Sequence, residues 1–364
     1  MATGPSEPSD PRFEEFGRLV EDGPKGPWLV LTHDNPDPDA LASAAVLARI
    51  LEQHFGRQVT CAYGGLIGRA ENREMVRALK IPLSHLRALS FDDYRRFALV
   101  DAQPGTGNNQ LPKSITADAV FDHHPKRRSA AGARFTDIRT EYGATATILG
   151  EYLADAGIEP TRALATALVY AIRSETQDFL RETGGPDKDL YDAVFPLVDK
   201  RALARIQSSR QPLAYFRNLH AALENLSTVE TLIVSHLGVV EQPDIVPEIA
   251  DLLLRLEGKT WSLSTGLYGD RVYLSIRTTN TRADAGGIMR KLVSRNGKGG
   301  GHGMLAGGWV KVTAGYAEDP PALQEQLARR LARILRKNPD RLQPLVLTAA
   351  SADGQQGGDE PKAK

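Results

Sequence analysis

The sequence has a single cysteine, Cys61, so a disulfide within one chain is excluded. It also lacks a long apolar run, because no segment approaches the roughly 20 residues that a membrane-spanning helix needs. Residues 1–11 are polar and proline-rich, without the apolar core of a signal peptide. These absences predict a protein of the reducing cytoplasm with no membrane partner, in which Cys61 is a small buried apolar residue.

An excess of one charge is missing as well. The chain carries 45 basic and 45 acidic residues, so its formal net charge is zero. A global attraction to nucleic acid is therefore absent, and any anion site must be local. This balance argues against long duplex DNA as a partner. The sequence leaves the oligomeric state open, with a homodimer as one alternative.

Length and pattern indicate two domains. The 364 residues exceed what one hydrophobic core usually holds. Continuous apolar runs at 28–31 and 97–100 alternate with amphipathic segments such as 40–55, which predicts an α/β domain with a parallel sheet. The expected organisation is a disordered tail over 1–10, the α/β domain over 11–205, a helical linker over 206–226 that acts as a hinge, a smaller α+β domain over 227–340, and a disordered tail over 345–364.

Carboxylates and imidazoles stand directly after three of the predicted strands. They are His33, Asp37 and Asp39 after 28–31, Asp101 after 97–100, and Asp122, His123 and His124 after the run 119–121. Because parallel strands end at the same edge of a sheet, three loops should converge on one crevice. Each group alone has an ordinary explanation, such as turn and helix-cap roles for the aspartates. Together they predict a metal site, and the share of carboxylates favours manganese over zinc or iron.

A glycine-rich stretch lies in the second predicted domain, at Gly299-Gly300-Gly301-His302-Gly303. Glycine lets the backbone approach a ligand closely, and successive exposed N–H groups form an anion nest. Such a stretch alone usually indicates a flexible surface turn. Arg277, in a predicted strand before it, is suited to bidentate contact with a phosphate. We therefore expect an anion-binding loop here.

Set side by side, these motifs resemble those of the DHH phosphoesterase superfamily. Gly-Gly-Gly-His and Ser275-Ile276-Arg277 resemble the DHHA1 domain that accompanies its nanoRNase, exonuclease and cyclic-dinucleotide branches, and the resemblance covers about residues 28–308. It is nearest to the branch of nanoRNases that also dephosphorylate pAp. The resemblance implies a hydrolase with two divalent metal ions that acts on oligoribonucleotides, pAp, or linear or cyclic dinucleotides.

The resemblance also implies roles for individual residues. His33 and Asp37 would bind one metal, Asp39 and His123 the other, and Asp101 would bridge the two. His124 would face the phosphate while Asp122 holds the motif in place. Substrate would be bound by four residues of the second domain, in an interdomain cleft: Arg277, Gly300, Gly301 and His302.

The sequence departs from the family pattern at one place. Ser174-Glu175-Thr176 stands where the fourth motif has a pattern like Thr-Asp-Thr, so Glu175 is the candidate ligand of the second metal. Its side chain is one methylene longer than aspartate, and Asp178 is the alternative, although a plain turn residue explains Asp178 as well. Two other functions remain open at this point. They are hydrolysis of pyrophosphate or polyphosphate, which the glycine-rich stretch disfavours, and nucleotide binding by a regulatory module with an impaired metal centre.

Overall fold

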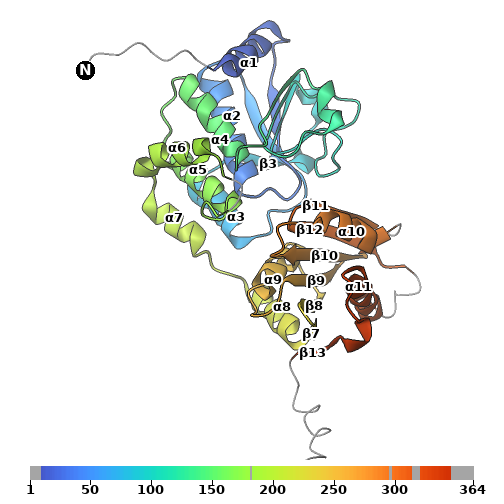
Figure 1. The fold of residues 1–364 in the computed structure, drawn as a ribbon. Helices are drawn as coiled ribbons and strands as arrows, with labels where there is room; N and C mark the ends of the chain where they lie inside the picture. The colour runs from blue at the N-terminus through green and yellow to red at the C-terminus, as the bar shows by residue number, and fades with distance from the viewer. Residues whose placement is uncertain (1–9, 181–182, 295–296, 314–319, 346–364) are drawn as a thin grey trace, which may run out of the picture. The chain divides into compact units, whose positions relative to one another are not determined.

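The computed structural model describes residues 10–180, 183–294, 297–313 and 320–345. The chain divides into two compact units, 1–210 and 211–364 (Figure 1). Except for Asp10 and Leu345, the two expected tails lie outside the described residues. The segment 206–226 is expected to form a linker; residues 206–210 lie with the first unit and 211–226 with the second. None of the described helices combines the length and the apolar character needed to cross a lipid bilayer.

The first unit contains a parallel sheet of six strands, as the alternating pattern predicts. The strands are β1 (Trp28–Leu31), β2 (Val59–Tyr63), β3 (Leu83–His85), β4 (Arg96–Val100), β5 (Ala119–Asp122) and β6 (Phe135–Ile138). Their order is β3-β2-β1-β4-β5-β6, and every neighbouring pair is parallel. Strands β1, β4 and β5 are therefore adjacent at the centre. The short strands β3 and β6 were not expected.

Helices cover one face of this sheet (Figure 1). The helices of the unit are α1 (Pro11–Asp22), α2 (Pro38–Gln53), α3 (Ala70–Leu79), α4 (Thr145–Asp155), α5 (Arg162–Glu175), α6 (Gly185–Val194) and α7 (Lys200–Gln207). The side chains of β1 point alternately to the two faces of the sheet. Trp28 and Val30 pack in the main core with the helices, whereas Leu29 and Leu31 pack in a smaller core on the other face. Cys61 is buried on the helical face, as expected.

The second unit is built on a mixed sheet of seven strands. Its elements are α8 (Leu213–Glu224), β7 (Leu226–Val229), β8 (Leu232–Val239), α9 (Ile245–Leu253), β9 (Trp261–Tyr268), β10 (Arg271–Thr278), α10 (Ala285–Val293), β11 (Gly297–His302), β12 (Leu305–Lys311), α11 (Pro320–Ile334) and β13 (Gln343–Pro344). The order is β11-β12-β10-β9-β8-β7-β13, antiparallel except for the pair β8–β9. The predicted α+β character is confirmed.

The glycine-rich stretch corrects one prediction. Residues 299–302 are not a loop but part of the edge strand β11, in which Gly300 pairs with Gly307 of β12, and Gly303 begins the turn that follows. A Cβ on Gly286 of α10 would lie only 2.1 Å from the carbonyl oxygen of Gly301, and one on Gly299 would lie 2.7 Å from Cγ of Met289. The glycines thus let α10 pack closely on the strand. Because an extended strand points successive N–H groups in opposite directions, this conformation does not form the expected anion nest.

Candidate metal centre

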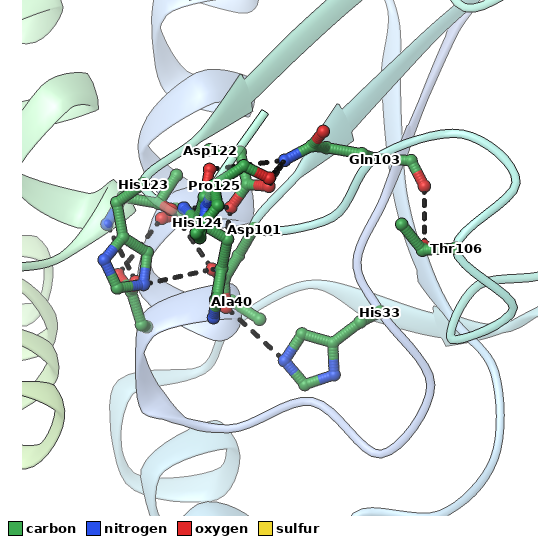
Figure 2. Close-up of polar contacts among 12 residues, drawn as sticks. His33, Ala40, Asp101, Gln103, Thr106, Asp122, His123, His124 and Pro125 are labelled. Atoms are coloured by element: carbon green, nitrogen blue, oxygen red, sulfur yellow. Dashed lines mark hydrogen bonds and ion pairs between the residues drawn. The ribbon is translucent and has the colours of Figure 1, made fainter. Parts of the chain in front are cut away.

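The loops after β1, β4 and β5 meet at the carboxyl edge of the first sheet. Figure 2 shows the rings of His33 and His123 reaching Asp101 from two sides. His33 follows β1 by two residues, Asp101 follows β4 directly, and Asp122 is the last residue of β5. Because the three strands are neighbours in a parallel sheet, side chains distant in sequence reach one place.

The first group consists of His33, Asp37 and Asp101. His33 Nε2 lies 3.6 Å from Asp37 Oδ2 and 3.4 Å from Asp101 Oδ2. The Nδ1 atom of the same ring lies 2.8 Å from the carbonyl oxygen of Asp34. A carbonyl can only accept a hydrogen bond, so Nδ1 carries a hydrogen. Burial acts to lower the pKa of His33, but the contacts with Asp101 and Asp37 outweigh it and raise the pKa well above its usual value, so Nε2 is protonated as well while no metal is bound. A metal ion between His33 and the two carboxylates would take the place of that proton.

Asp37 is held in place by the helix that it begins. Its Oδ1 accepts hydrogen bonds from the backbone N–H groups of Asp39, at 3.0 Å, and Ala40, at 3.1 Å. This is an N-cap of α2. The cap uses Oδ1 and leaves Oδ2 turned to His33. Burial acts to raise the pKa of Asp37, but the contact with His33 outweighs burial and the pKa is lowered.

The second group is centred on His123. Its Nε2 lies 3.7 Å from Asp101 Oδ1, 3.9 Å from Asp39 Oδ2 and 4.0 Å from Glu175 Oε1. Its Nδ1 lies 3.2 Å from the carbonyl oxygen of Tyr142, which again places the hydrogen on Nδ1. Among the described residues, the buried Nε2 atom has no hydrogen-bond partner.

This arrangement fits a divalent cation. A buried lone pair that faces three carboxylates is unfavourable unless positive charge lies between them. Imidazole nitrogen and carboxylate oxygen together suit manganese, iron or zinc. The geometry around His123 Nε2, which is buried without a hydrogen-bond partner among the described residues, therefore supports a metal site independently of any sequence motif.

Asp101 belongs to both groups. Its Oδ2 faces His33, while its Oδ1 faces His123 and accepts a hydrogen bond of 3.2 Å from Thr145 Oγ1. The residue is 3% exposed and has a φ of +53°, in the left-handed region that few residues other than glycine adopt. Such strain is typical of functional positions. Burial acts to raise the pKa of Asp101, but the contacts with His124 and His33 hold it far below its usual range.

Asp39 has a second task that the sequence did not reveal. Its oxygens accept hydrogen bonds from the backbone N–H groups of Thr145, at 2.8 Å, and Ala146, at 2.7 Å. Helix α4 begins after Ala144, whose side chain offers no cap. Asp39 thus caps α4 across the site. It lies 3.9 Å from His123 Nε2, but the tighter cluster at that place consists of Asp101, His123 and His124.

His124, a member of this cluster, also contacts Asp122, which Gln103 holds in turn. His124 Nδ1 lies 2.9 Å from Asp122 Oδ1 and 3.4 Å from Asp101 Oδ1. Burial lowers the pKa of His124, but the contacts with Asp101 and Asp122 outweigh it and raise the pKa to about 11. While no metal is bound, the ring is therefore an imidazolium at neutral pH, and its side chain is 35% exposed.

Gln103 is a residue that the sequence analysis missed. Its Nε2 donates to Asp122 Oδ2 at 2.6 Å (Figure 2), and its Oε1 accepts from the backbone N–H of Arg127 at 2.7 Å. The side chain is 2% exposed. It holds the carboxylate that orients His124 and also the chain after Pro125. Its position two residues after Asp101 was the available signal.

The structure distinguishes between the two candidate ligands Glu175 and Asp178. Glu175 ends α5 and reaches within 4.0 Å of His123, whereas Asp178 Oδ1 accepts from Arg173 Nε at 2.6 Å and its side chain is 62% exposed. Burial, together with the negative charges of Asp37 and Asp101, raises the pKa of Glu175 to about 8. The structure places Glu175 at the site and Asp178 in a surface ion pair.

The residues expected to bind substrate lie in the second unit. Arg277 is in β10, where its Nε donates to Asp251 Oδ1 at 2.7 Å and its side chain is 11% exposed. The guanidinium is thus already engaged by a carboxylate of α9. Gly300 and Gly301 are in β11, and the side chain of His302 lies outside the described part of the chain.

The fold and the site together define a class: an α/β unit with groups of Asp and His side chains at its carboxyl edge that could hold a metal ion, followed by a mixed-sheet unit. Residues 27–172 match the DHH family, N-terminal domain, and residues 230–333 match the DHHA1 domain, together more than half of the chain. The chain therefore belongs to the DHH family, whose members are phosphoesterases. The expected resemblance to the superfamily is confirmed in both domains, and its nearness to the nanoRNase branch stays a prediction.

Two curated relatives resemble the chain in sequence. An uncharacterised protein of Methanocaldococcus jannaschii is 36% identical over 289 residues, which cover 79% of this chain and 58% of the relative. An A-adding tRNA nucleotidyltransferase of Geobacter sulfurreducens is 25% identical over 244 residues, which cover 64% of this chain and 27% of the relative. The chain thus spans little more than half of the first relative and about a quarter of the second.

A solved structure shares the fold over both units. The exopolyphosphatase-related protein from Bacteroides fragilis superposes with a TM-score of 0.69 at 14% identity, covering 90% of this chain and 98% of that one. At this identity the likeness concerns the fold alone.

Proposed function

We propose that this chain is a metal-dependent phosphoesterase that holds two divalent ions, preferably manganese, and hydrolyses short nucleotide phosphoesters. One observation carries the proposal: the lone pair of His123 Nε2, buried and without a hydrogen-bond partner in the described structure, faces Asp101, whose other oxygen faces His33. Asp101 is suited to join two metal sites. His33 and Asp37 complete one site, and His123, Asp39 and Glu175 complete the other.

The bound ions would supply Lewis acidity, lowering the pKa of water and polarising a phosphate oxygen. The side chains supply the rest of the chemistry. Burial lowers the pKa of His124, but Asp101 and Asp122 raise it to about 11 while no metal is bound, so a protonated ring would stabilise the negative charge that develops on phosphate oxygens as the ester bond breaks. Asp122 holds its Nδ1 at 2.9 Å, and Gln103 holds Asp122 at 2.6 Å, so the ring is oriented before substrate arrives.

Short nucleotide esters are the proposed substrate class, with oligoribonucleotides, pAp and linear or cyclic dinucleotides as members. Family membership supports phosphoester chemistry, and a relative named for adding A to tRNA supports a nucleotide substrate. The second unit is proposed to contribute substrate contacts through Arg277, Gly300, Gly301 and His302. For Arg277 this requires the guanidinium to leave Asp251 or to be shared with it. We place the protein in the cytoplasm, in keeping with its single, buried cysteine.

A parallel rate screen tests this function. Purified protein is incubated with Mn²⁺, and separately with Mg²⁺, Zn²⁺ and Co²⁺, on dinucleotides, pAp, cyclic dinucleotides, bis-p-nitrophenyl phosphate and pyrophosphate. We expect metal-dependent release of mononucleotide or phosphate from the nucleotide esters. Faster turnover of pyrophosphate would contradict the substrate class. Metal binding with no turnover of any ester would instead indicate a nucleotide-binding regulatory module.

A further inference from the structure

One peptide group connects the second metal group to a carboxylate outside it. The carbonyl oxygen of Tyr142 lies 3.2 Å from His123 Nδ1, and the N–H of the next residue, Gly143, donates to Asp187 Oδ2 at 2.7 Å. The carbonyl and the N–H belong to the same peptide bond. A chain of two hydrogen bonds therefore runs from Asp187 through this peptide to the His123 ring.

Asp187 is held in this position by hydrogen bonds to both of its side-chain oxygens. It is completely buried, in the first turn of α6. Its Oδ2 also accepts from the backbone N–H of Gly184 at 2.8 Å, and its Oδ1 accepts from Thr147 Oγ1 at 2.5 Å. All three contacts are donated by N–H or O–H groups, and the two side-chain oxygens of Asp187 accept them. The residue lies outside both segments that match the family domains.

The effect on His123 follows from polarisation. A negative charge that accepts a hydrogen bond from an amide N–H draws electron density toward the carbonyl oxygen of the same peptide, which becomes a stronger acceptor. A stronger acceptor at Nδ1–H fixes the tautomer and makes the opposite nitrogen a better ligand, as carboxylates do when they contact metal-binding histidines directly. Here the peptide lies between the carboxylate and the ring.

We infer that Asp187 is a positioning residue of the metal centre, which acts through the Tyr142–Gly143 peptide to orient His123 and strengthen its binding of a divalent cation. The inference rests on the proposed metal-binding function. A role confined to folding is the alternative, because Asp187 Oδ2 also accepts from the backbone N–H of Gly184, the N-cap residue of α6. A positioning role predicts weaker metal binding in folded protein when Asp187 is replaced. A role confined to folding predicts lower stability with unchanged metal affinity in the molecules that fold.

The test uses the full chain with Asp187→Asn, which keeps the shape of the side chain but removes its charge. Thr147→Val is the matched control, because it removes a hydrogen bond to Asp187 Oδ1 but leaves Gly143 and Oδ2 unchanged. Co²⁺ and Mn²⁺ affinities are measured by calorimetry, and the cobalt d–d absorption reports the ligand field at each site. We expect Asp187→Asn to bind one of two ions about tenfold more weakly with an altered cobalt spectrum, and Thr147→Val to bind both as the wild type does.

Equal affinities in Asp187→Asn and the wild type would overturn the inference. Equal losses in both variants would do so too, because they would indicate a purely structural effect. If Asp187→Asn does not fold, Asp187→Ser, which keeps a hydroxyl to accept an N–H, is measured against the same criteria. Failure of the wild type itself to bind any divalent ion would refute the proposed function, and with it this inference.

Discussion

Replacing Asp101 with asparagine tests the shared position in the metal centre. The substitution preserves size and can keep the hydrogen bond from Thr145 Oγ1, but it removes the one charge that faces both groups. Asp101 oxygens lie 3.4 Å from His33 Nε2 and 3.7 Å from His123 Nε2. A change at this residue should therefore affect both metal sites, whereas a change at His33 or His123 should affect mainly one.

The size of the effect follows from electrostatics. Two unit charges about 4 Å apart interact by about 4 kcal/mol at an effective dielectric constant of 20. A divalent ion doubles this attraction, and the cost of removing its water offsets part of the gain. We expect Asp101→Asn to lose at least about 4 kcal/mol of metal-binding free energy, which is roughly a thousandfold in affinity. Hydrolysis of the preferred nucleotide ester should fall by at least as much.

Isothermal titration with Mn²⁺, together with initial rates at saturating Mn²⁺, measures both quantities. Asp178→Asn is the control, because this nearby carboxylate pairs with Arg173 and is 62% exposed. The control should keep both metals and its activity. Wild-type metal affinity and rate in Asp101→Asn would refute the shared-ligand geometry, and loss at only one site would show that Asp101 does not serve both.

Three further variants test other parts of the structure. Gln103→Leu removes a 2.6 Å hydrogen bond to Asp122. We expect kcat to fall by about ten- to a hundredfold, while the metal affinity measured by calorimetry stays unchanged. Weaker metal binding would show that Gln103 supports the metal ligands instead. Burial raises the pKa of Glu175 to about 8, so a metal ion must displace its proton, and metal affinity at that site should rise with pH up to about 8. Glu175→Gln should weaken metal binding at that site and abolish its pH dependence. An unchanged pH profile in this variant would exclude Glu175 as a ligand. Burial lowers the pKa of His236 to about 4, below its value near 6.5 in the unfolded chain. The contribution of His236 to the free energy of unfolding is therefore fully present above pH 6.5 and is lost as the pH drops toward 4. At pH 5 the cost is about 2 kcal/mol, so denaturant unfolding of His236→Gln should lose less stability than the wild type between pH 7 and pH 5, and equal losses would contradict the assignment.

The convergence of ligands was predictable because it depends on a simple rule. Parallel strands end at one edge, so the polar residues placed directly after β1, β4 and β5 have to meet there. His33, Asp101 and His123 could be found in this way without knowledge of any loop conformation. The choice of Glu175 over Asp178 was harder, because it depended on where α5 ends and on the ion pair with Arg173.

Other features depended on contacts that no local pattern encodes. Asp187 reaches Gly143 from 44 residues away, and Asp39 caps a helix that begins 106 residues later. Glycine has no side chain to show the alternation of a strand, so β11 resembled a loop until its pairing with β12 was known. The edge strand β6 and the short β3 lacked the continuous apolar run that marked the central strands.

The number of Mn²⁺ ions bound per chain tests the central claim most directly. Metal-free protein is titrated with Mn²⁺ while electron paramagnetic resonance records free Mn²⁺ and the magnetic coupling between neighbouring bound ions. The structure predicts two ions per chain with a coupled signal, because Asp101 faces both groups. A single ion, two ions without coupling, or no binding would contradict the two-metal centre.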